Sequence, residues 1–380
     1  MNFELSEEQL LLKDSVERTL SRAYGFEARA KILASPDGWS REAWAQLAEL
    51  GVLGLPFAAQ DGGFDAGPVE TMIVMEAVGR ALVVEPYLPT VVTAGALLRR
   101  GAGAELRARL VPQIAEGGLV LAFAHAEPQA RWTLCDVATT ARRVDGGYRL
   151  TGRKSVVVAG GIADLLAVSA RTAGARTDTA GIGLFLVDPK AAGVSIRAYP
   201  TQDGRCAADI LLADVFVADA DVIGDPEGGY AAICGAVDEG IAAVCAEAVG
   251  AMDEALAMTV DYLKTRTQFG VAIGSFQALQ HRAADMFVAL EQARSMALYA
   301  VMSVAEPDPE ARAAALSAAK VQIGRSGRFI GQEAIQLHGG IGMTMEYKVG
   351  HLFKRLTMID KEFGDVDHHL ARLGAGGGLL

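Results

Sequence analysis

One stretch of the sequence gathers a cation, an amide and an aromatic ring around the end of a predicted helix. It reads YLKTRTQFG over residues 262–270 and SFQALQH over residues 275–281. The first helix is predicted to end at Gly270 and a second to begin soon after, so a guanidinium at Arg266 is suited to bind a pyrophosphate. Phe269 could flank a flat heterocycle. The alternative is a solvated helix end whose phenylalanine serves only in packing.

A second stretch places three glycines shortly after an amide side chain. It reads QLHGGIGM over residues 336–343. Because glycine has no Cβ, such a run lets a ligand approach the backbone closely. The alternative is an ordinary helix C-cap followed by a turn.

The first third of the chain is predicted to be helical. Ser6, followed three residues later by Gln9, is typical of a capping box, and apolar residues then recur at helical spacing. We expect further helices over Arg41–Leu50, Val69–Leu82, Val91–Arg99 and Glu105–Glu116.

The middle of the chain, from about Val120 to Val217, carries short β-type runs separated by Gly, Asp and Pro. No run of helical length lies between them, so the pattern predicts an antiparallel sandwich or barrel rather than βαβ units. No G-x-G-x-x-G follows these runs, which argues against a Rossmann site. The predicted strands are Val137–Val144, Tyr148–Thr151, Ser155–Val158, Leu165–Ala170, Gly183–Val187, Val194–Ala198, Asp209–Leu212 and Val215–Val217.

Long helical patterns return near the C-terminus. They cover Ala231–Lys264, Gln277–Val304 and Glu310–His338. The fold class is therefore α+β with three domains. We expect an N-terminal helical domain over residues 1–118, a central β domain over residues 119–228 and a C-terminal helical bundle over residues 229–380.

Composition limits the classes of function. Of the 380 residues, 51% are apolar and 21% are charged, which excludes an intrinsically disordered chain. The net charge of −11 argues against binding to nucleic acid or an anionic membrane surface, because both require clustered Lys and Arg. Charges interrupt every apolar stretch before the roughly 18 residues that a membrane span needs.

Cysteine and histidine spacing predicts no metal site. The 4 cysteines include no C-x-x-C and the 6 histidines include no H-x-x-x-H. Residues 1–20 are acidic and amphipathic, which is not typical of a signal peptide. We therefore expect a reducing, cytoplasmic location.

The two stretches described first, about 70 residues apart, resemble the acyl-CoA dehydrogenase family, in which they read R-x-Q-F-G…FQ-x-x-Q and Q-x-x-GG-x-G. The resemblance covers essentially the whole chain. It includes LSEEQ at 5–9, GVLG at 51–54, DGG at 61–63, AEP at 126–128 and GRK at 152–154. It implies N-terminal helices, a central β domain and a C-terminal four-helix bundle. It also implies FAD as cofactor, an electron-transferring flavoprotein as partner, and α,β-dehydrogenation of an acyl-CoA thioester.

In that family the adenosine diphosphate end of FAD is held by the neighbouring subunit. The matching positions here are Arg266, Gln268, Phe269, Gln277, Gln336, Gly339 and Gly340. A cation for the pyrophosphate, glycines that permit close approach and an aromatic near a ring agree with the role that the resemblance implies.

The chain departs from the family where the flavin ring is expected. The family's T-E-P-x-x-G-S-D begins AEPQARW at 126–132, and its K-x-W-x-T-N reads KSVVVA at 154–159, so several flavin-binding hydroxyls are missing. Arg131 and Trp132 could substitute, since Arg can face an anionic flavin edge and Trp can stack. Val156 and Val158 occupy the positions of the family's Trp and second Thr. The alternative is that Arg131 and Trp132 only pack at the surface.

Neither of the family's positions for a catalytic base holds a carboxylate. Counting from Arg355, one position falls on Gly364; counting back from Gly250, the other falls on Gly240. Abstraction of the α-proton still requires a carboxylate within hydrogen-bond reach.

Glu247 is the first candidate for the base. It lies in an otherwise apolar helix, two turns after Gly240. A carboxylate buried in such a helix usually either pairs with a cation or has a function in catalysis. The alternative is a structural glutamate paired with an arginine across the bundle. Asp365 and Glu239 are further candidates, and the base could come from another chain. Asp238, which matches the family's helix-start acid, is expected to contact the substrate.

The chain thus keeps the residues that would bind the diphosphate of a neighbour's FAD. It departs from the family at the positions that would contact its own flavin ring and supply its own base. This predicts a homo- or heterotetramer with a paralogous chain, and the resemblance is greatest to small subunits of two-component, pimeloyl-CoA dehydrogenase-like enzymes. The predicted function is FAD-dependent acyl-CoA dehydrogenation in fatty acid or dicarboxylate degradation. The alternatives are a non-catalytic subunit that completes a paralogue's FAD site, and a flavin oxidase or monooxygenase on the same fold.

Overall fold

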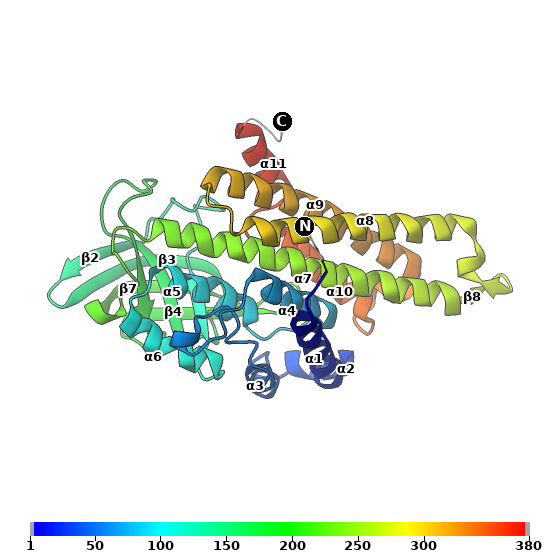
Figure 1. Cartoon of the computed structure of the whole chain (residues 1–380), viewed down its shortest axis with the longest axis horizontal. Helices are drawn as coiled ribbons and strands as arrows, with labels where there is room; N and C mark the ends of the chain where they lie inside the picture. The colour runs from blue at the N-terminus through cyan, green and yellow to red at the C-terminus, as the bar shows by residue number, and fades with distance from the viewer. Residues whose placement is uncertain (1–3, 377–380) are drawn as a thin grey trace. The chain divides into compact units, whose positions relative to one another are not determined.

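The computed structural model describes residues 4–376, which form helices, then a sheet, then helices along the chain (Figure 1). This confirms the expected fold of N-terminal helices, a curled central sheet and a C-terminal helical domain. The chain packs as two compact units. The first comprises Met1–Lys31, Pro68–Val83 and Ile241–Leu380, and the second comprises Ile32–Gly67 and Val84–Gly240. The three predicted domain boundaries stay a prediction.

The N-terminal part forms short helices. They are α1 (Glu7–Ala23), α2 (Phe26–Leu33), α3 (Arg41–Glu49), α4 (Pro68–Ala81), α5 (Gly95–Gly101) and α6 (Ala104–Ala115). The capping box is confirmed, since Ser6 Oγ accepts from Gln9 N at 3.2 Å and Gln9 Oε1 accepts from Ser6 N at 3.0 Å. Helix α2 was not predicted because eight residues are too few to show a period. A π-helix over Leu88–Ala94 precedes α5, where the sequence predicts one α-helix.

The middle of the chain folds into a seven-stranded sheet in the order β1-β4-β2-β3-β7-β6, with β5 paired to β4. The strands are β1 (Leu121–Ala124), β2 (Thr140–Val144), β3 (Gly147–Val158), β4 (Leu165–Arg171), β5 (Ile182–Val187), β6 (Val194–Pro200) and β7 (Cys206–Ala218). Most pairings are antiparallel, as predicted. Strand β4 differs, because it pairs in parallel with β1 and, at one residue pair, with β2. The long connection that a parallel pairing needs is supplied by the β2–β3 hairpin.

Strands β3 and β7 are longer than predicted. Each unites two of the predicted strands across a shift in the β3–β7 register, between Leu150 and Gly152 and again between Lys154 and Val157. A β-bulge interrupts the alternation of side chains. The alternation of apolar and polar residues therefore stops at each bulge although the strand continues, so the sequence predicts two short strands in place of one long strand.

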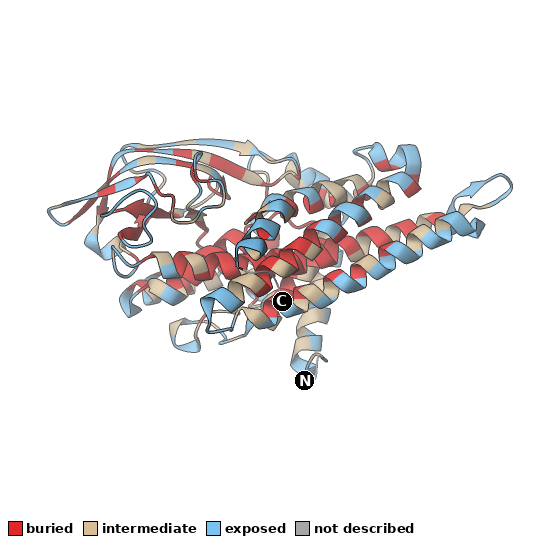
Figure 2. Cartoon of the chain, turned by 90° about the horizontal axis from the view of Figure 1, so that it is seen from above, coloured by how far each residue is buried: buried red, intermediate tan, exposed pale blue. Residues whose placement is uncertain are grey.

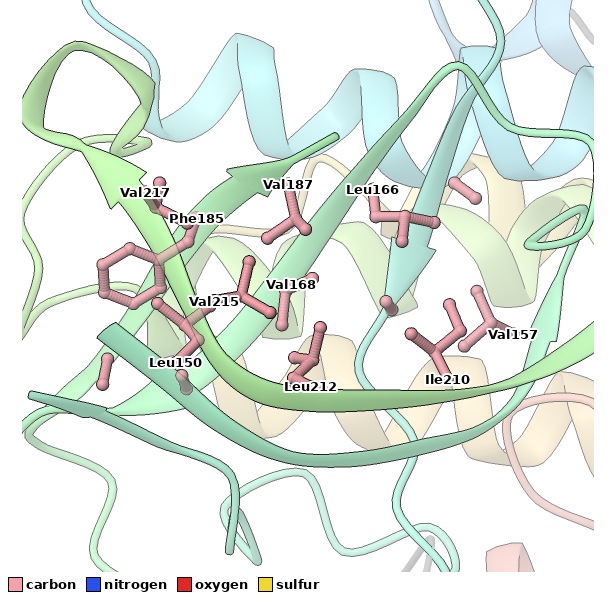
Figure 3. Packing of buried hydrophobic residues seen from close by; sticks show 14 of the residues in the cluster. Leu150, Val157, Leu166, Val168, Phe185, Val187, Ile210, Leu212, Val215 and Val217 are labelled. Atoms are coloured by element: carbon pink, nitrogen blue, oxygen red, sulfur yellow. The ribbon is translucent and has the colours of Figure 1, made fainter. Parts of the chain in front are cut away.

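One face of the sheet buries a hydrophobic core (Figure 3). Leu150 and Val157 of β3 and Ile210 and Leu212 of β7 are all buried in it. Phe185 of β5 packs in the same cluster and is fully buried. Burial of such side chains contributes roughly 1.5–3 kcal/mol each, so the core gives the sheet a rigid frame for the loops that follow its strands.

A buried arginine organises the loop after β4. Arg171 donates hydrogen bonds of 2.8–3.2 Å to the backbone carbonyls of residues 135, 137, 173, 176, 178 and 180. A guanidinium has five N–H donors in a fixed plane. One side chain therefore fixes residues 173–181 against residues 135–137.

The C-terminal part consists of long helices. They are α7 (Tyr230–Thr265), α8 (Gln277–Ser303), α9 (Pro309–His338), α10 (Lys348–Lys361) and α11 (Val366–Ala375). The first three match the predicted ranges within a few residues. Helix α7 begins in the second unit and continues into the first.

Helices α4 and α7 cross at a pair of glycines. A Cβ on Gly79 would lie 1.9 Å from the carbonyl oxygen of Glu247, and a Cβ on Gly250 would lie 1.9 Å from that of Glu76. The obstacle is backbone in both cases, so no side-chain rotation can relieve it. Only glycine fits at the two positions.

Within residues 4–376, no helix combines the length and the apolarity that crossing a membrane requires. In the same range, no three or more His, Cys, Asp or Glu side chains come together where they could hold a metal ion.

Candidate functional site

The first motif lies on an exposed hairpin in the first unit. Strands β8 (Thr267–Gln268) and β9 (Val271–Ala272) join α7 to α8 and project past the ends of these helices (Figure 1). Phe269, at the turn, has a φ of 56° and is 90% exposed. Arg266 and Gln268 are exposed beside it, and the hairpin is marked as exposed in Figure 2. The helix thus ends before the predicted Gly270.

The second motif lies at the same end of the helical bundle. Helix α9 ends at His338, whose ring stacks on that of Tyr262 of α7 with centroids 4.6 Å apart. Arg282 of α8 pairs with Glu333 of α9 at 2.5 Å. These contacts bring residues 336–340 alongside the end of α7 and the start of α8, so the structure joins two motifs that are about 70 residues apart.

The grouped residues fit an extended anionic ligand. A Cβ on either glycine of the pair 339–340 would meet no described atom within 4 Å, so the space over this backbone is open. Gln277 and Gln336 are both exposed. Arg266 supplies a positive charge and Phe269 an aromatic face at the same end. This donor set suits a diphosphate joined to a flat base.

The residues predicted beside a flavin ring lie on two segments of the second unit. Arg131, in the loop after β1, is exposed and has a φ of 48°. Val156 lies in the β3 bulge, is 53% exposed and has a φ of 51°. Val158 is half-buried, and Ala159 has a φ of 60°. Left-handed backbone is uncommon outside glycine and is a genuine outlier for a β-branched residue.

A buried lysine connects these two segments. Lys154 is fully buried, and its Nζ donates to Glu127 Oε1 at 2.7 Å, to Ser169 Oγ at 3.0 Å and to the His125 carbonyl at 3.2 Å. Glu127 also accepts from the backbone N–H groups of residues 138 and 139. Burial lowers the pKa of Lys154 to about 8 and that of His125 to about 3. The cluster therefore holds one ion pair and a neutral histidine at pH 7.

The Glu127 ion pair should make stability depend on pH. Burial alone would raise the pKa of Glu127, but Lys154 and the hydrogen bonds outweigh it and lower the pKa from 4.5 to about 2. A lowered carboxylate pKa stabilises the fold above pH 4.5, and this contribution is lost as the pH falls toward 2. We expect the wild type to exceed Glu127→Gln by about 3 kcal/mol in unfolding free energy at pH 6.

Urea unfolding of both proteins at pH 6, 4 and 3 measures this effect. The glutamine does not titrate, so the difference between the two proteins should shrink steadily below pH 4.5. A difference that stays constant over this range would contradict the assignment.

Glu247, the first candidate for the base, is fully buried in an ion pair. Both of its oxygens accept from Arg355, each at 2.7 Å. Arg355 also donates to Glu362, at 2.6 Å and 3.2 Å. A carboxylate with both oxygens engaged is less able to accept a proton from a substrate carbon. The geometry therefore favours the structural alternative, and the role of Glu247 as base stays a prediction.

The other candidate carboxylates also have partners. Asp365 is the N-cap of α11, accepting from the backbone N of His368 at 3.0 Å and from Lys361 Nζ at 3.0 Å. Burial would raise the pKa of Asp365, but these bonds outweigh it and lower the pKa. Glu239, in the second unit, pairs with Arg99 and Arg100. Asp238 is buried and engaged as well. Their catalytic or substrate roles stay predictions.

Gly364, at one of the family's base positions, is closed to any side chain. It has a φ of 113°, and a Cβ there would lie 2.5 Å from His368 Cδ2 and 2.7 Å from His369 Nε2. His369 is fully buried and bonded to Ser317 Oγ at 3.1 Å, so a shift of its ring would break this bond. Lys320 Nζ holds the same turn by donating to the Gly364 carbonyl at 2.9 Å. The local structure therefore requires glycine here.

Sequence reasoning missed two charged residues of these networks. Glu362 carried no signal of its own, because its partner Arg355 is reached across the turn that ends α10. Lys154 was noted only as part of a motif. The sequence gives no sign that it is buried, because the polar residues Arg153 and Ser155 flank it.

Comparisons with known proteins identify the family. Three family models match in succession: acyl-CoA dehydrogenase N-terminal domain over residues 6–118, middle domain over residues 122–215, and C-terminal domain over residues 227–374. The 3-(aryl)acrylate reductase of Clostridium sporogenes (strain ATCC 15579) is 32% identical over 328 residues, which are 84% of this chain and 85% of the relative.

Solved structures agree with this fold. A variant of the Tcur3481-Tcur3483 steroid ACAD is 28% identical, with a TM-score of 0.87 and 97% of each chain covered. The FAD complex of PigA is 25% identical, with a TM-score of 0.90 and 100% of each chain covered.

Proposed function

This chain belongs to the acyl-CoA dehydrogenase family and is a FAD-dependent oxidoreductase acting on CH–CH groups, and we propose that it oxidises an acyl-CoA thioester to the 2-enoyl-CoA as one subunit of a two-chain assembly. The observation that carries this proposal is an asymmetry. The residues suited to the FAD diphosphate are intact and exposed, whereas each candidate base in this chain is engaged by a partner.

FAD, when bound, accepts the hydride that leaves the β-carbon. In this chain Arg266 and the backbone of residues 339–340 bind the diphosphate of one FAD, and Phe269 flanks its adenine. Arg131, Val156 and Val158 face the ring of another FAD, whose diphosphate the neighbouring subunit holds. These roles follow the residue types and their exposure.

The α-proton must pass to a carboxylate with a free oxygen. The occupied oxygens of Glu247 and the closed position at Gly364 argue that the paired chain supplies this base. Reducing equivalents then pass to an electron-transferring flavoprotein. A relative whose structure carries two chain names, Tcur3481-Tcur3483, supports a two-chain arrangement.

Co-expression with a paralogous dehydrogenase chain tests the assembly. We expect the purified pair to be yellow, to contain both chains in equal amounts and to be bleached by an acyl-CoA. This chain alone should bind less than one FAD per chain and should not bleach. One FAD per chain and full bleaching by this chain alone would refute the two-chain proposal.

Measurements on the same co-expressed pair distinguish the two alternative functions, a non-catalytic subunit and a flavin oxidase or monooxygenase. A non-catalytic subunit predicts that substitution of Arg131 or Val156 in this chain leaves the turnover of the pair unchanged, whereas the proposed function, in which these residues face a flavin ring, predicts a loss. An oxidase or monooxygenase predicts oxygen consumption with each turnover. A dehydrogenase instead requires an added flavoprotein acceptor and consumes no oxygen.

Arg266→Ala should weaken FAD binding. A charge-assisted hydrogen bond to a phosphate contributes about 1.5–3 kcal/mol, so we expect the Kd for FAD to rise roughly 10- to 150-fold. Fluorescence titration of the apoprotein with FAD measures it.

Lys264→Ala is the matched control, because Lys264 is also an exposed cation at the end of α7. It should change the Kd less than about threefold. Equal losses in the two variants would show a general charge effect instead of a site at Arg266.

A further inference from the structure

Lys154 is the centre of a fully satisfied buried network. Its ammonium has three N–H donors, and it uses all three, on Glu127, on Ser169 and on the carbonyl of His125. Ser169 Oγ also lies 2.8 Å from His125 Nδ1, so hydrogen bonds connect all four side chains.

This network joins two segments that are far apart in the sequence. The first, residues 125–131, follows β1, and the second, residues 154–159, is the bulged end of β3. A backbone bond from Ser155 N to the Ala126 carbonyl, at 2.9 Å, adds to the link. Lys154 and Glu127 thus tie the two segments side by side.

The same two segments hold unusual backbone. Arg131, Val156 and Ala159 all have left-handed φ values, of 48°, 51° and 60°. Each such residue costs of the order of 1 kcal/mol or more and persists only where the surroundings over-determine it. Bulges next to active sites commonly re-aim a side chain. Here the bulge leaves Val156 53% exposed, and its N–H donates to Asp209 Oδ1 at 3.3 Å.

A buried charge is a costly means of packing. A buried ion pair can often be replaced by apolar residues without loss of stability, whereas removal of one partner is strongly destabilising. The pair between Lys154 and Glu127 therefore does more than fill space. What it supplies is a fixed distance between two strained, solvent-facing segments.

We propose that Lys154 is a positioning residue, which through Glu127 and Ser169 holds residues 126–131 and 155–159 in the conformation that faces the flavin ring. This rests on the proposed function, in which these segments face the flavin. Lys154 does not touch the flavin. It acts through the exposed Arg131 and Val156.

Lys154→Met tests the proposal in the FAD-loaded protein, prepared with its paired chain. We expect the visible absorption band and the reduction potential of the flavin to shift. A displacement of about 1 Å at a reacting centre lowers rates about a hundredfold, so kcat should fall by that order while KM changes little. In the apoprotein, amide exchange of residues 126–131 and 155–159 should speed up about tenfold or more.

Arg171→Met is the matched control. Arg171 is also a buried cation of this sheet, but it fixes residues 173–181 against residues 135–137. It should lower stability and speed exchange in its own loop, without changing the flavin spectrum or potential. Equal spectral shifts in both variants would overturn the proposal, because any loss of stability would then suffice.

The double variant Lys154→Met/Glu127→Gln separates positioning from stability. It leaves no unpaired buried charge, so it should regain much of the stability lost in Lys154→Met. The link between the segments is still missing, so the altered flavin spectrum should remain. Recovery of the wild-type spectrum together with stability would overturn the proposal.

Failure of the proposed function has a different signature. If the wild-type assembly binds no FAD, the proposed function fails and the positioning role fails with it. If the wild type binds FAD and Lys154→Met leaves the flavin spectrum, the potential and the amide exchange unchanged, only the positioning role is overturned.

Discussion

Gly250→Ala should lower the free energy of unfolding by at least about 3 kcal/mol. Overpacking usually costs about 1–3 kcal/mol where side chains can shift, but here the new Cβ would lie 1.9 Å from the carbonyl oxygen of Glu76. The obstacle is the backbone of α4, so the two helices would have to separate. Gly79→Ala meets the carbonyl of Glu247 at the same distance and should behave alike. Urea unfolding followed by far-UV circular dichroism measures both.

Gly327→Ala provides a control of opposite sign. Gly327 is buried in α9, but a Cβ there would lie 3.4 Å from Leu356 Cδ2, an ordinary contact. Alanine is preferred over glycine within a helix by about 1 kcal/mol. We therefore expect Gly327→Ala to be neutral or slightly stabilising. A similar loss in Gly327→Ala and Gly250→Ala would mean that the α4–α7 crossing is not specially tight.

Arg355→Met should destabilise the first unit by about 3–5 kcal/mol. Arg355 is 2% exposed and pairs with two carboxylates, Glu247 and Glu362. Its removal leaves Glu247, which is fully buried, without its cation. Thermal unfolding of the purified protein should show the loss as a much lower Tm.

Arg328→Met is the matched control, because its side chain is 64% exposed and its carboxylate partner Asp360 is 3.8 Å away. Asp360 is buried but keeps Lys361 as a partner at 3.1 Å, and a distant pair with an exposed arginine contributes little, so Tm should stay near the wild-type value. A comparable loss in both variants would contradict the buried-pair argument.

Glu247→Gln separates the structural from the catalytic role of Glu247. A general base contributes about 10²–10⁴-fold to the rate. If the residue is structural, the folded fraction of the FAD-loaded Gln variant should keep turnover within about tenfold of the wild type, despite reduced stability. A loss of a thousandfold or more at full FAD occupancy would instead restore Glu247 as the base.

Local patterns in the sequence were sufficient to predict the long helices and the capping box. Ser6 and Gln9 are three residues apart, and the pattern of each long helix repeats many times within its own length. The resemblance to a family then connected residues 262–277 with residues 336–340. The structure brings these two stretches to one end of the bundle through Tyr262 and His338.

Contacts between residues far apart in the chain could not be predicted from the sequence. Glu247 and Arg355 are 108 positions apart, so the sequence could show that a buried glutamate needs a partner but not which arginine supplies it. The parallel pairing of β1 with β4 depends on which strands meet across an intervening hairpin. The left-handed backbone of Val156 is opposed by the preference of valine itself, so only tertiary contacts explain it.

The closed turn around Gly364 affects how readily this chain could regain a catalytic base of its own during evolution. A single codon change to glutamate would drive a Cβ into His369, which is anchored to Ser317 and to the Phe363 carbonyl. Reversal would also need His368 and His369 to move and the backbone at this position, with a φ of 113°, to change. In the proposed two-chain assembly, a single substitution at Gly364 would therefore not restore a catalytic base in this chain. Once His368 and His369 pack against the glycine, the chain would continue to depend on its sister chain for that base.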